Sequence, residues 1–65
     1  MRKKLKIGNL VRVNFIGSNY ICEVIELVDK TTYKARNIKT GVIIPNLRWK
    51  AHKDKKSVWF IEAFI

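Results

Sequence analysis

The sequence YICEVIELV, at residues 20–28, is the longest stretch of the chain that is rich in β-branched and apolar residues and free of glycine and proline. This composition predicts a long β-strand. Cys22 and Val24 share one side of the strand and Ile25 and Leu27 the other, so one phase slip near Val24 would bring all four to the same face. A β-bulge or a sharp bend produces such a slip. A strand that changes face partway can belong to two sheets, which is how a very small barrel closes without a helix.

Four other segments have the alternation or the apolar run expected of a strand. They lie at residues 10–16, 32–38, 42–44 and 57–65. Gly17–Asn19 is expected to form the turn of a hairpin between the first two strands. Pro45 is expected to end the fourth strand because it has no N–H for a sheet ladder, and residues 45–49 are expected to form a single 3₁₀ turn. The last segment is expected to be a fifth strand, although Ser57 could instead cap a final helical turn.

The chain carries a large excess of positive charge, with fourteen Lys and Arg against five Asp and Glu and a formal net charge of +9. An apolar fraction of 48% among 65 residues indicates one folded domain rather than a disordered chain. The charge therefore suits a polyanionic partner such as nucleic acid, an acidic protein surface or anionic lipid. Four of the cations fall within the first six residues, which predicts a mobile basic N-terminal arm at residues 1–6 and a single domain at residues 7–65.

Cys22 and His52 are the only residues of their types, so neither a disulfide framework nor a multi-ligand metal site is expected within one chain, and no cofactor is expected. They are also the only nucleophile and base of the cysteine type, and the glycines stand apart in separate turns rather than in a phosphate loop. Enzymatic activity is therefore not expected. Polar residues interrupt the start of the chain before a signal-peptide apolar region can form, and no run approaches the ~20 apolar residues that span a bilayer. The expected location is the cytoplasm.

Five short strands in meander order, with a bent second strand and a 3₁₀-like turn before the last, resemble a small SH3-like barrel. The strand and turn segments are more specifically similar to those of Tudor-type barrels, at VRVNF (11–15), YICEVI (20–25), YKAR (33–36), Gly41 and PNLR (45–48). The resemblance covers about residues 7–49, and its first half is also similar to KOW-type barrels, except that Cys22 stands where those have glycine. It implies an all-β, single five-stranded SH3-like (Tudor-like) barrel with short loops.

Tudor domains that read methylated Lys or Arg use a cage of aromatic rings, because several π faces together hold a bulky cation. The resemblance implies that Phe15 and Tyr20 supply two walls of such a cage. Asn37 and Thr40 stand where the other aromatic residues are found, and Lys39 stands where an acid is common. Recognition of a methylated cation is therefore not expected.

Twelve residues are candidates for contacts with nucleic acid, in three groups. They are Arg2, Lys3 and Lys4 in the arm; Arg12, Lys34 and Arg36 on outward faces of the first and third strands; and Arg48, Trp49, Lys50, Lys53, Lys55 and Lys56 after the fourth strand. The strand-face group could equally be neutralised by cross-strand ion pairs with Glu23 and Glu26. The last group has few acids to pair with it and predicts phosphate binding, with a merely solvated loop as the alternative. Trp49 could stack on a base, although a large aromatic residue in so short a chain is more often part of the core.

Composition and pattern together favour a small binding module. The preferred hypothesis is a nucleic-acid-binding barrel whose phosphate contacts give affinity for DNA or RNA with little sequence specificity. The alternative hypothesis is a protein-interaction module, either a Tudor-like adaptor or a phage-type inhibitor of a host protein, in which residues 58–65 or a strand edge dock on an acidic partner or on a second copy. The heavy use of Lys, Ile and Asn fits, by analogy, an AT-rich bacterial or phage genome.

Overall fold

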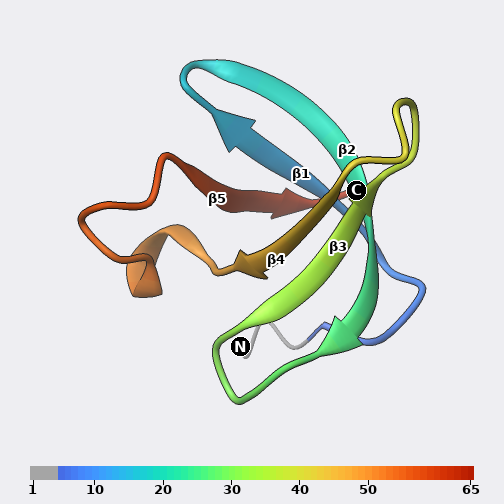
Figure 1. Cartoon of the computed structure of the whole chain (residues 1–65), viewed down its shortest axis with the longest axis horizontal. Helices are drawn as coiled ribbons and strands as arrows, with labels where there is room; N and C mark the ends of the chain where they lie inside the picture. The colour runs from blue at the N-terminus through green and yellow to red at the C-terminus, as the bar shows by residue number, and fades with distance from the viewer. Residues whose placement is uncertain (1–4) are drawn as a thin grey trace.

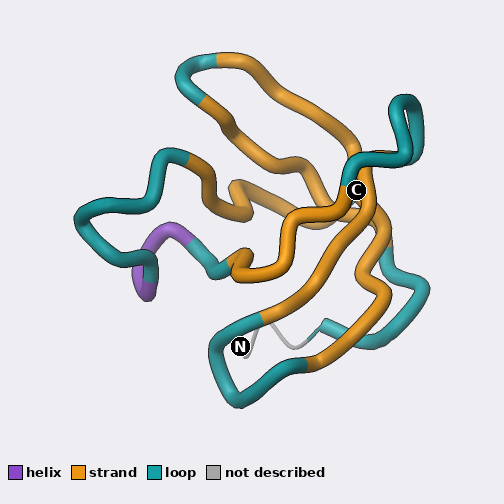
Figure 2. The backbone as a smooth tube through the Cα atoms, viewed as in Figure 1, coloured by secondary structure: helices purple, strands orange, loops and turns teal. Residues whose placement is uncertain are grey.

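The structure, a computed structural model, describes residues 5–65 as a five-stranded antiparallel sheet that curls into a half-barrel (Figure 1). The strands are β1 (Leu10–Phe15), β2 (Ser18–Leu27), β3 (Tyr33–Asn37), β4 (Ile43–Leu47) and β5 (Trp59–Phe64). Their order across the sheet is β4-β3-β2-β1-β5, so β5 returns to lie beside β1. A 3₁₀ turn, η1 (Lys50–His52), lies in the long connection between β4 and β5 (Figure 2). The expected all-β fold is confirmed, and within the described residues no helix has the length and apolar character needed to cross a membrane.

The long strand β2 contains the predicted phase slip. Its pairing with β3 shifts register between Val24 and Glu26, which is a β-bulge or a similar irregularity. The bend lets β2 pair with β1 through its first half and with β3 through its second. The expectation that Leu27 faces inward is wrong, because Leu27 is 47% exposed. The pairing of β1 with β2 begins at Leu10 and Glu23, so β1 does not extend alongside the last residues of β2, where Leu27 lies.

The two edge strands approach each other where the connection after β4 passes β5. The Ile61 N–H donates to the Arg48 carbonyl at 2.8 Å, and Trp49 forms a parallel bridge with Ile61. These contacts join the two ends of the curled sheet, and they place the 3₁₀ turn and the loop that follows it beside β5.

Ten buried hydrophobic residues form the core inside the half-barrel. They are Leu5, Val11, Val13, Cys22, Val24, Tyr33, Ala35, Leu47, Trp49 and Ile61. The alternation predicted for β1 and β3 is confirmed over most of each strand. Val11 and Val13 of β1 and Tyr33 and Ala35 of β3 are buried, and the next inward residue of each strand is half-buried. Each strand therefore contributes at least one side chain to a single core.

Leu5 corrects the expected boundary of the N-terminal arm. It is only 2% exposed and belongs to the core. The segment after it is tied to β2, because the Gly8 N–H donates to the Val24 carbonyl and the Val24 N–H donates to the Asn9 carbonyl. The folded domain therefore begins no later than Leu5 instead of at residue 7. The candidate residues of the arm, Arg2, Lys3 and Lys4, lie outside the described residues.

Pro45 lies within β4 and does not end it, and the 3₁₀ turn comes later than expected. β4 is an edge strand, and its register with β3 shifts so that Pro45 and Asn46 lie opposite the single residue Lys34. A proline is tolerated in such a place because the missing N–H belongs to no ladder hydrogen bond. The chain remains extended as far as Trp49, and the 3₁₀ turn then forms at residues 50–52.

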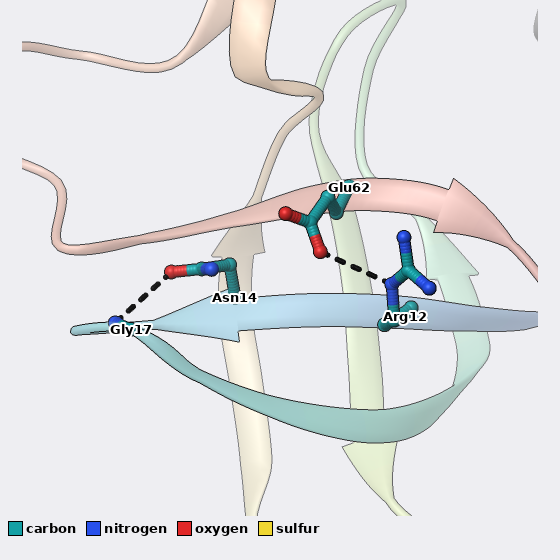
Figure 3. Close-up of polar contacts among 4 residues, drawn as sticks. All are labelled: Arg12, Asn14, Gly17 and Glu62. Carbon is teal, nitrogen blue, oxygen red and sulfur yellow. Dashed lines mark hydrogen bonds and ion pairs between the residues drawn. The ribbon is translucent and has the colours of Figure 1, made fainter.

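The turn between β1 and β2 consists of Ile16 and Gly17, since Ser18 and Asn19 already pair with β1. Both turn residues have positive φ, 49° at Ile16 and 82° at Gly17, as in the two-residue type I′ hairpin turn. The Gly17 N–H donates to the Asn14 side-chain oxygen at 3.3 Å (Figure 3). Glycine suits its position, whereas a β-branched side chain at positive φ is strained.

Replacing Ile16 with asparagine should raise the free energy of unfolding by about 1 kcal/mol, because asparagine tolerates this conformation and favours the type I′ turn. Little burial is lost, since Ile16 is 72% exposed. Urea titration followed by circular dichroism measures the change. The matched control is Ile7→Asn, which removes a similarly exposed isoleucine, 65% exposed, at a position without positive φ. Equal effects of the two substitutions would contradict the strain at Ile16.

Candidate nucleic-acid interface

The candidate cations on the outward face of the sheet are paired with glutamates. The ion pairs join Arg12 to Glu62 at 3.0 Å, Lys34 to Glu26 at 3.1 Å and Arg36 to Glu23 at 3.1 Å. The Arg12 pair connects β1 with β5 (Figure 3), a partner that the sequence did not suggest. Exposed pairs of this kind add little stability. They do cancel the charge of the sheet face locally. Of the two interpretations of this group, phosphate binding and cross-strand ion pairing, the structure contains the ion pairs.

The connection between β4 and β5 carries a concentration of unpaired positive charge. Lys50, Lys55 and Lys56 are exposed, and none of them forms an ion pair with a carboxylate within residues 5–65. The Lys50 ammonium instead lies 5.7 Å from the centre of the Phe60 ring. The only acid in residues 50–56 is Asp54. This segment, orange in Figure 1, projects from one side of the half-barrel.

Two other candidate cations, Lys53 and Arg48, form hydrogen bonds within the protein. The Lys53 ammonium donates to the carbonyls of Asp54 and Ser57, each at 3.3 Å. The Arg48 Nε donates to the Thr32 hydroxyl at 2.9 Å. Both side chains are partly buried, so they hold the surface in shape and offer less free charge than the exposed lysines.

Most of the Trp49 side chain is buried. It is only 9% exposed, it belongs to the core, and its ring centre lies 5.4 Å from that of Phe64. This burial agrees with the alternative that Trp49 is part of the core, and stacking of Trp49 on a base stays a prediction. The chain remains extended through Trp49 to the bridge with Ile61, which turns the ring into the half-barrel.

Sequence reasoning missed the role of Trp59. Phe15 and Tyr20, the two expected walls, do line one pocket together with Asn37 and Thr40, and Trp59 of β5 supplies a third aromatic wall. Trp59 shares the inward parity of Ile61, two residues later, so the pattern of the last segment contained the necessary signal. The indole N–H of Trp59 is covered and has no hydrogen-bond partner among the described residues. Packing against Phe15 therefore holds the ring.

The loop between β2 and β3 holds a carboxylate in a turn. Asp29 Oδ1 accepts hydrogen bonds from the Thr31 N–H at 2.9 Å and the Thr32 N–H at 3.0 Å. The Thr31 hydrogen bond is the largest cause of a lowered pKa at Asp29, and the hydrogen bonds of Thr32 and the charge of Arg48 lower the pKa further. The same loop thus positions Arg48 through Thr32.

Acid should weaken the fold partly through Asp29. Because the pKa of this carboxyl is lower in the folded chain than its ordinary value of about 3.9, its contribution to stability is complete above that value and disappears as the pH falls through the folded pKa. Asp29→Asn keeps an acceptor oxygen for both amides but does not titrate in this range. The free energy of unfolding of the unmodified chain should exceed that of Asp29→Asn by more at pH 7 than at about pH 2. An equal difference at the two pH values would contradict this role.

The single cysteine offers no reactive site. Cys22 is fully buried in the core, and burial raises the pKa of its thiol, which disfavours the nucleophilic thiolate. Within the part of the chain that the structure describes, no group of three His, Cys, Asp or Glu side chains could hold a metal ion. The expectation that Cys22 acts as a small buried hydrophobe is confirmed.

Comparison of the chain with protein-family models, with curated proteins and with solved structures found no significant match. The class of protein is therefore described from its fold and its surface charge. It is a small all-β domain, a curled half-barrel whose sheet face is neutralised and whose long connection between β4 and β5 is basic.

Proposed function

We propose that this protein is a small nucleic-acid-binding module of the SH3-like, Tudor-like type, which binds the phosphate backbone with little sequence specificity. One observation carries the proposal, namely the uneven distribution of positive charge over the surface. Arg12, Lys34 and Arg36 each have a glutamate within 3.1 Å, whereas Lys55 and Lys56 have no carboxylate partner among the described residues. Lys6, Lys30 and Lys39 are also exposed and have no carboxylate partner within residues 5–65, but they stand apart in separate turns, whereas Lys50, Lys55 and Lys56 lie together in the connection between β4 and β5.

Exposed lysines with no ion pair suit phosphates well. They lose no carboxylate partner when they bind, and each neutralised phosphate releases condensed counterions, which favours binding at low salt. Such contacts fix the position of a protein on nucleic acid but carry no sequence information. Lys50, Lys55 and Lys56 supply the contacts, Lys53 and Arg48 shape the loop around them, and the basic residues before Leu5 add further charge.

The proposal contains no catalytic step. Cys22 lies in the core and His52 is exposed in the basic connection, so the only cysteine and the only histidine do not form a site. On the sequence grounds given above, the proposed place of action is the cytoplasm.

Fluorescence anisotropy with labelled duplex DNA, single-stranded DNA and RNA tests the proposal. Binding should be detectable at about 50 mM salt and should weaken steeply towards about 200 mM, with a linear fall of log affinity against log salt concentration. Absence of binding to all three probes at the lower salt concentration would overturn the proposal.

A second candidate function is favoured by the apolar surface beside the open edge of β4. Ile38, Val42 and Ile43 are 53%, 60% and 51% exposed, and β4 has a sheet neighbour on one side only. Such an edge can pair with a strand of another chain. Sedimentation across a range of concentrations tests pairing with a second copy. A dimer that Val42→Asp dissociates would support this function, and a monomer throughout would count against self-association.

A further inference from the structure

Phe15, Tyr20 and Trp59 supply three aromatic walls to one pocket. The ring centres of Phe15 and Trp59 lie 5.5 Å apart with 33° between their planes, and those of Phe15 and Tyr20 lie 6.5 Å apart. The pocket has a volume of about 290 Å³, just below the usual range for small-molecule sites, about 300–1,000 Å³. Tyr20 is 41% exposed, so one wall is open to an entering group.

The charges around the pocket disfavour a cation and favour a group attached to an anionic chain. No acidic side chain lines the pocket. Lys39 is exposed in the turn between Asn37 and Thr40, both of which line it, and Lys55 and Lys56 lie only a few residues before Trp59. A cation held by aromatic rings would meet these positive charges without a neutralising carboxylate.

The polar part of the pocket wall is preorganised. The Asn37 side-chain oxygen accepts hydrogen bonds from the N–H groups of Lys39 and Thr40 at 2.8 Å and 3.2 Å. This arrangement fixes the turn that carries Lys39 beside the pocket. A flat group in the pocket would therefore have aromatic faces next to it and a positive charge at the rim.

We propose that this pocket takes one unstacked base of a single-stranded nucleic acid, with the neighbouring phosphates near Lys39, Lys55 and Lys56. The inference rests on the proposed nucleic-acid binding and adds a preference for single strands over duplex. Every base presents a π face to an aromatic side chain, so the site tolerates any sequence. A base within a duplex is stacked and paired, and it enters such a pocket only at the cost of leaving the stack.

The direct test compares binding of an oligo(dT) single strand, the same strand with abasic sites, and a duplex of equal length. Loss of stacking on one base should weaken binding of the abasic strand by the unmodified protein about 5- to 150-fold. Phosphates alone would bind the intact and the abasic strand equally, and that result would overturn the inference while the proposed function stands. Failure of all three probes to bind would overturn both the base-binding inference and the proposed nucleic-acid binding.

Substitution of Tyr20 locates the base in the pocket. Tyr20→Ala should weaken binding of the single strand about 5- to 150-fold and leave binding of the duplex within about twofold, because it removes one ring and no charge. The matched control is Tyr20→Phe, which keeps the ring and should bind as the unmodified protein does. Equal affinity of Tyr20→Ala for the single strand would overturn the assignment, and circular dichroism verifies that each variant is folded.

A methylated cation is the competing occupant of the pocket. Peptides carrying trimethyllysine or dimethylarginine should bind no more tightly than their unmethylated forms. A methyl-dependent gain of about tenfold or more that Tyr20→Ala abolishes would overturn the assignment of the pocket to a base.

Discussion

Replacing Leu5 with alanine should lower the free energy of unfolding by about 2–5 kcal/mol, because the substitution removes a fully buried side chain and leaves a cavity. Leu5 is 2% exposed in the core of a chain of 65 residues. A domain this small has a total stability near the lower end of the usual range, about 5–15 kcal/mol. The variant should therefore be partly unfolded at ambient temperature, and urea titration followed by circular dichroism measures the loss.

The matched control is Ile7→Ala, two residues further along the same segment. Ile7 is 65% exposed, so its truncation should change the free energy of unfolding by less than about 0.5 kcal/mol. Equal, small effects of the two substitutions would show that the N-terminal segment is a mobile arm as far as residue 6, as the sequence predicted. A large loss of stability for Leu5→Ala together with a small change for Ile7→Ala would place the start of the domain no later than Leu5.

The strands were predictable because their local patterns are strong. β1 and β3 alternate between apolar and polar residues, and the mismatch of parity within residues 20–28 indicated the irregularity that the structure places between Val24 and Glu26. Each of these signals resides in a few consecutive residues. No knowledge of the neighbouring strands was needed to read them.

The errors arose where the environment is supplied by distant parts of the chain. Leu5 stands between lysines, so local composition predicted an exposed arm, and its burial depends on the packing of other strands. Pro45 fits within β4 only because β4 lies at the edge of the sheet. Strand order is a property of the whole fold, and local patterns do not carry it.

The candidate site shows the same division between local and distant information. The absence of acids in the segment around Lys55 could be read directly from the sequence. The pairing of Arg12 with Glu62 and the approach of Trp59 to Phe15 both depend on β5 lying beside β1. Nothing in the local sequence of β1 indicates that neighbour.

Removing the three unpaired lysines of the connection between β4 and β5 should flatten the salt dependence of nucleic-acid binding more than removing the same charge from the ion-paired sheet face. The loop variant combines Lys50→Gln, Lys55→Gln and Lys56→Gln. If all three contact phosphates, the slope of log affinity against log salt concentration on duplex DNA should fall in magnitude by up to about 2.7. Anisotropy titrations between about 50 and 200 mM salt measure the slope.

The control variant removes the same amount of charge from the sheet face by combining Arg12→Gln, Lys34→Gln and Arg36→Gln. Each of these residues is already neutralised by a glutamate, so the slope should change by less than about 0.9, the value of one phosphate contact. Because the ion pairs are exposed, each loss should cost no more than about 1 kcal/mol of stability. A larger change of slope in the control than in the loop variant would place the binding surface on the sheet.

The central claim is that nucleic acid binds at the basic connection between β4 and β5 and not on the ion-paired face of the sheet. Titration of the ¹⁵N-labelled protein with an oligonucleotide, followed through its amide resonances, tests this claim most directly. We expect the largest shifts at residues 50–59, with further shifts at Tyr20 and Lys39 when the oligonucleotide is single-stranded. Shifts confined to the neighbours of Arg12, Lys34 and Arg36, or to the edge of β4, would contradict the claim.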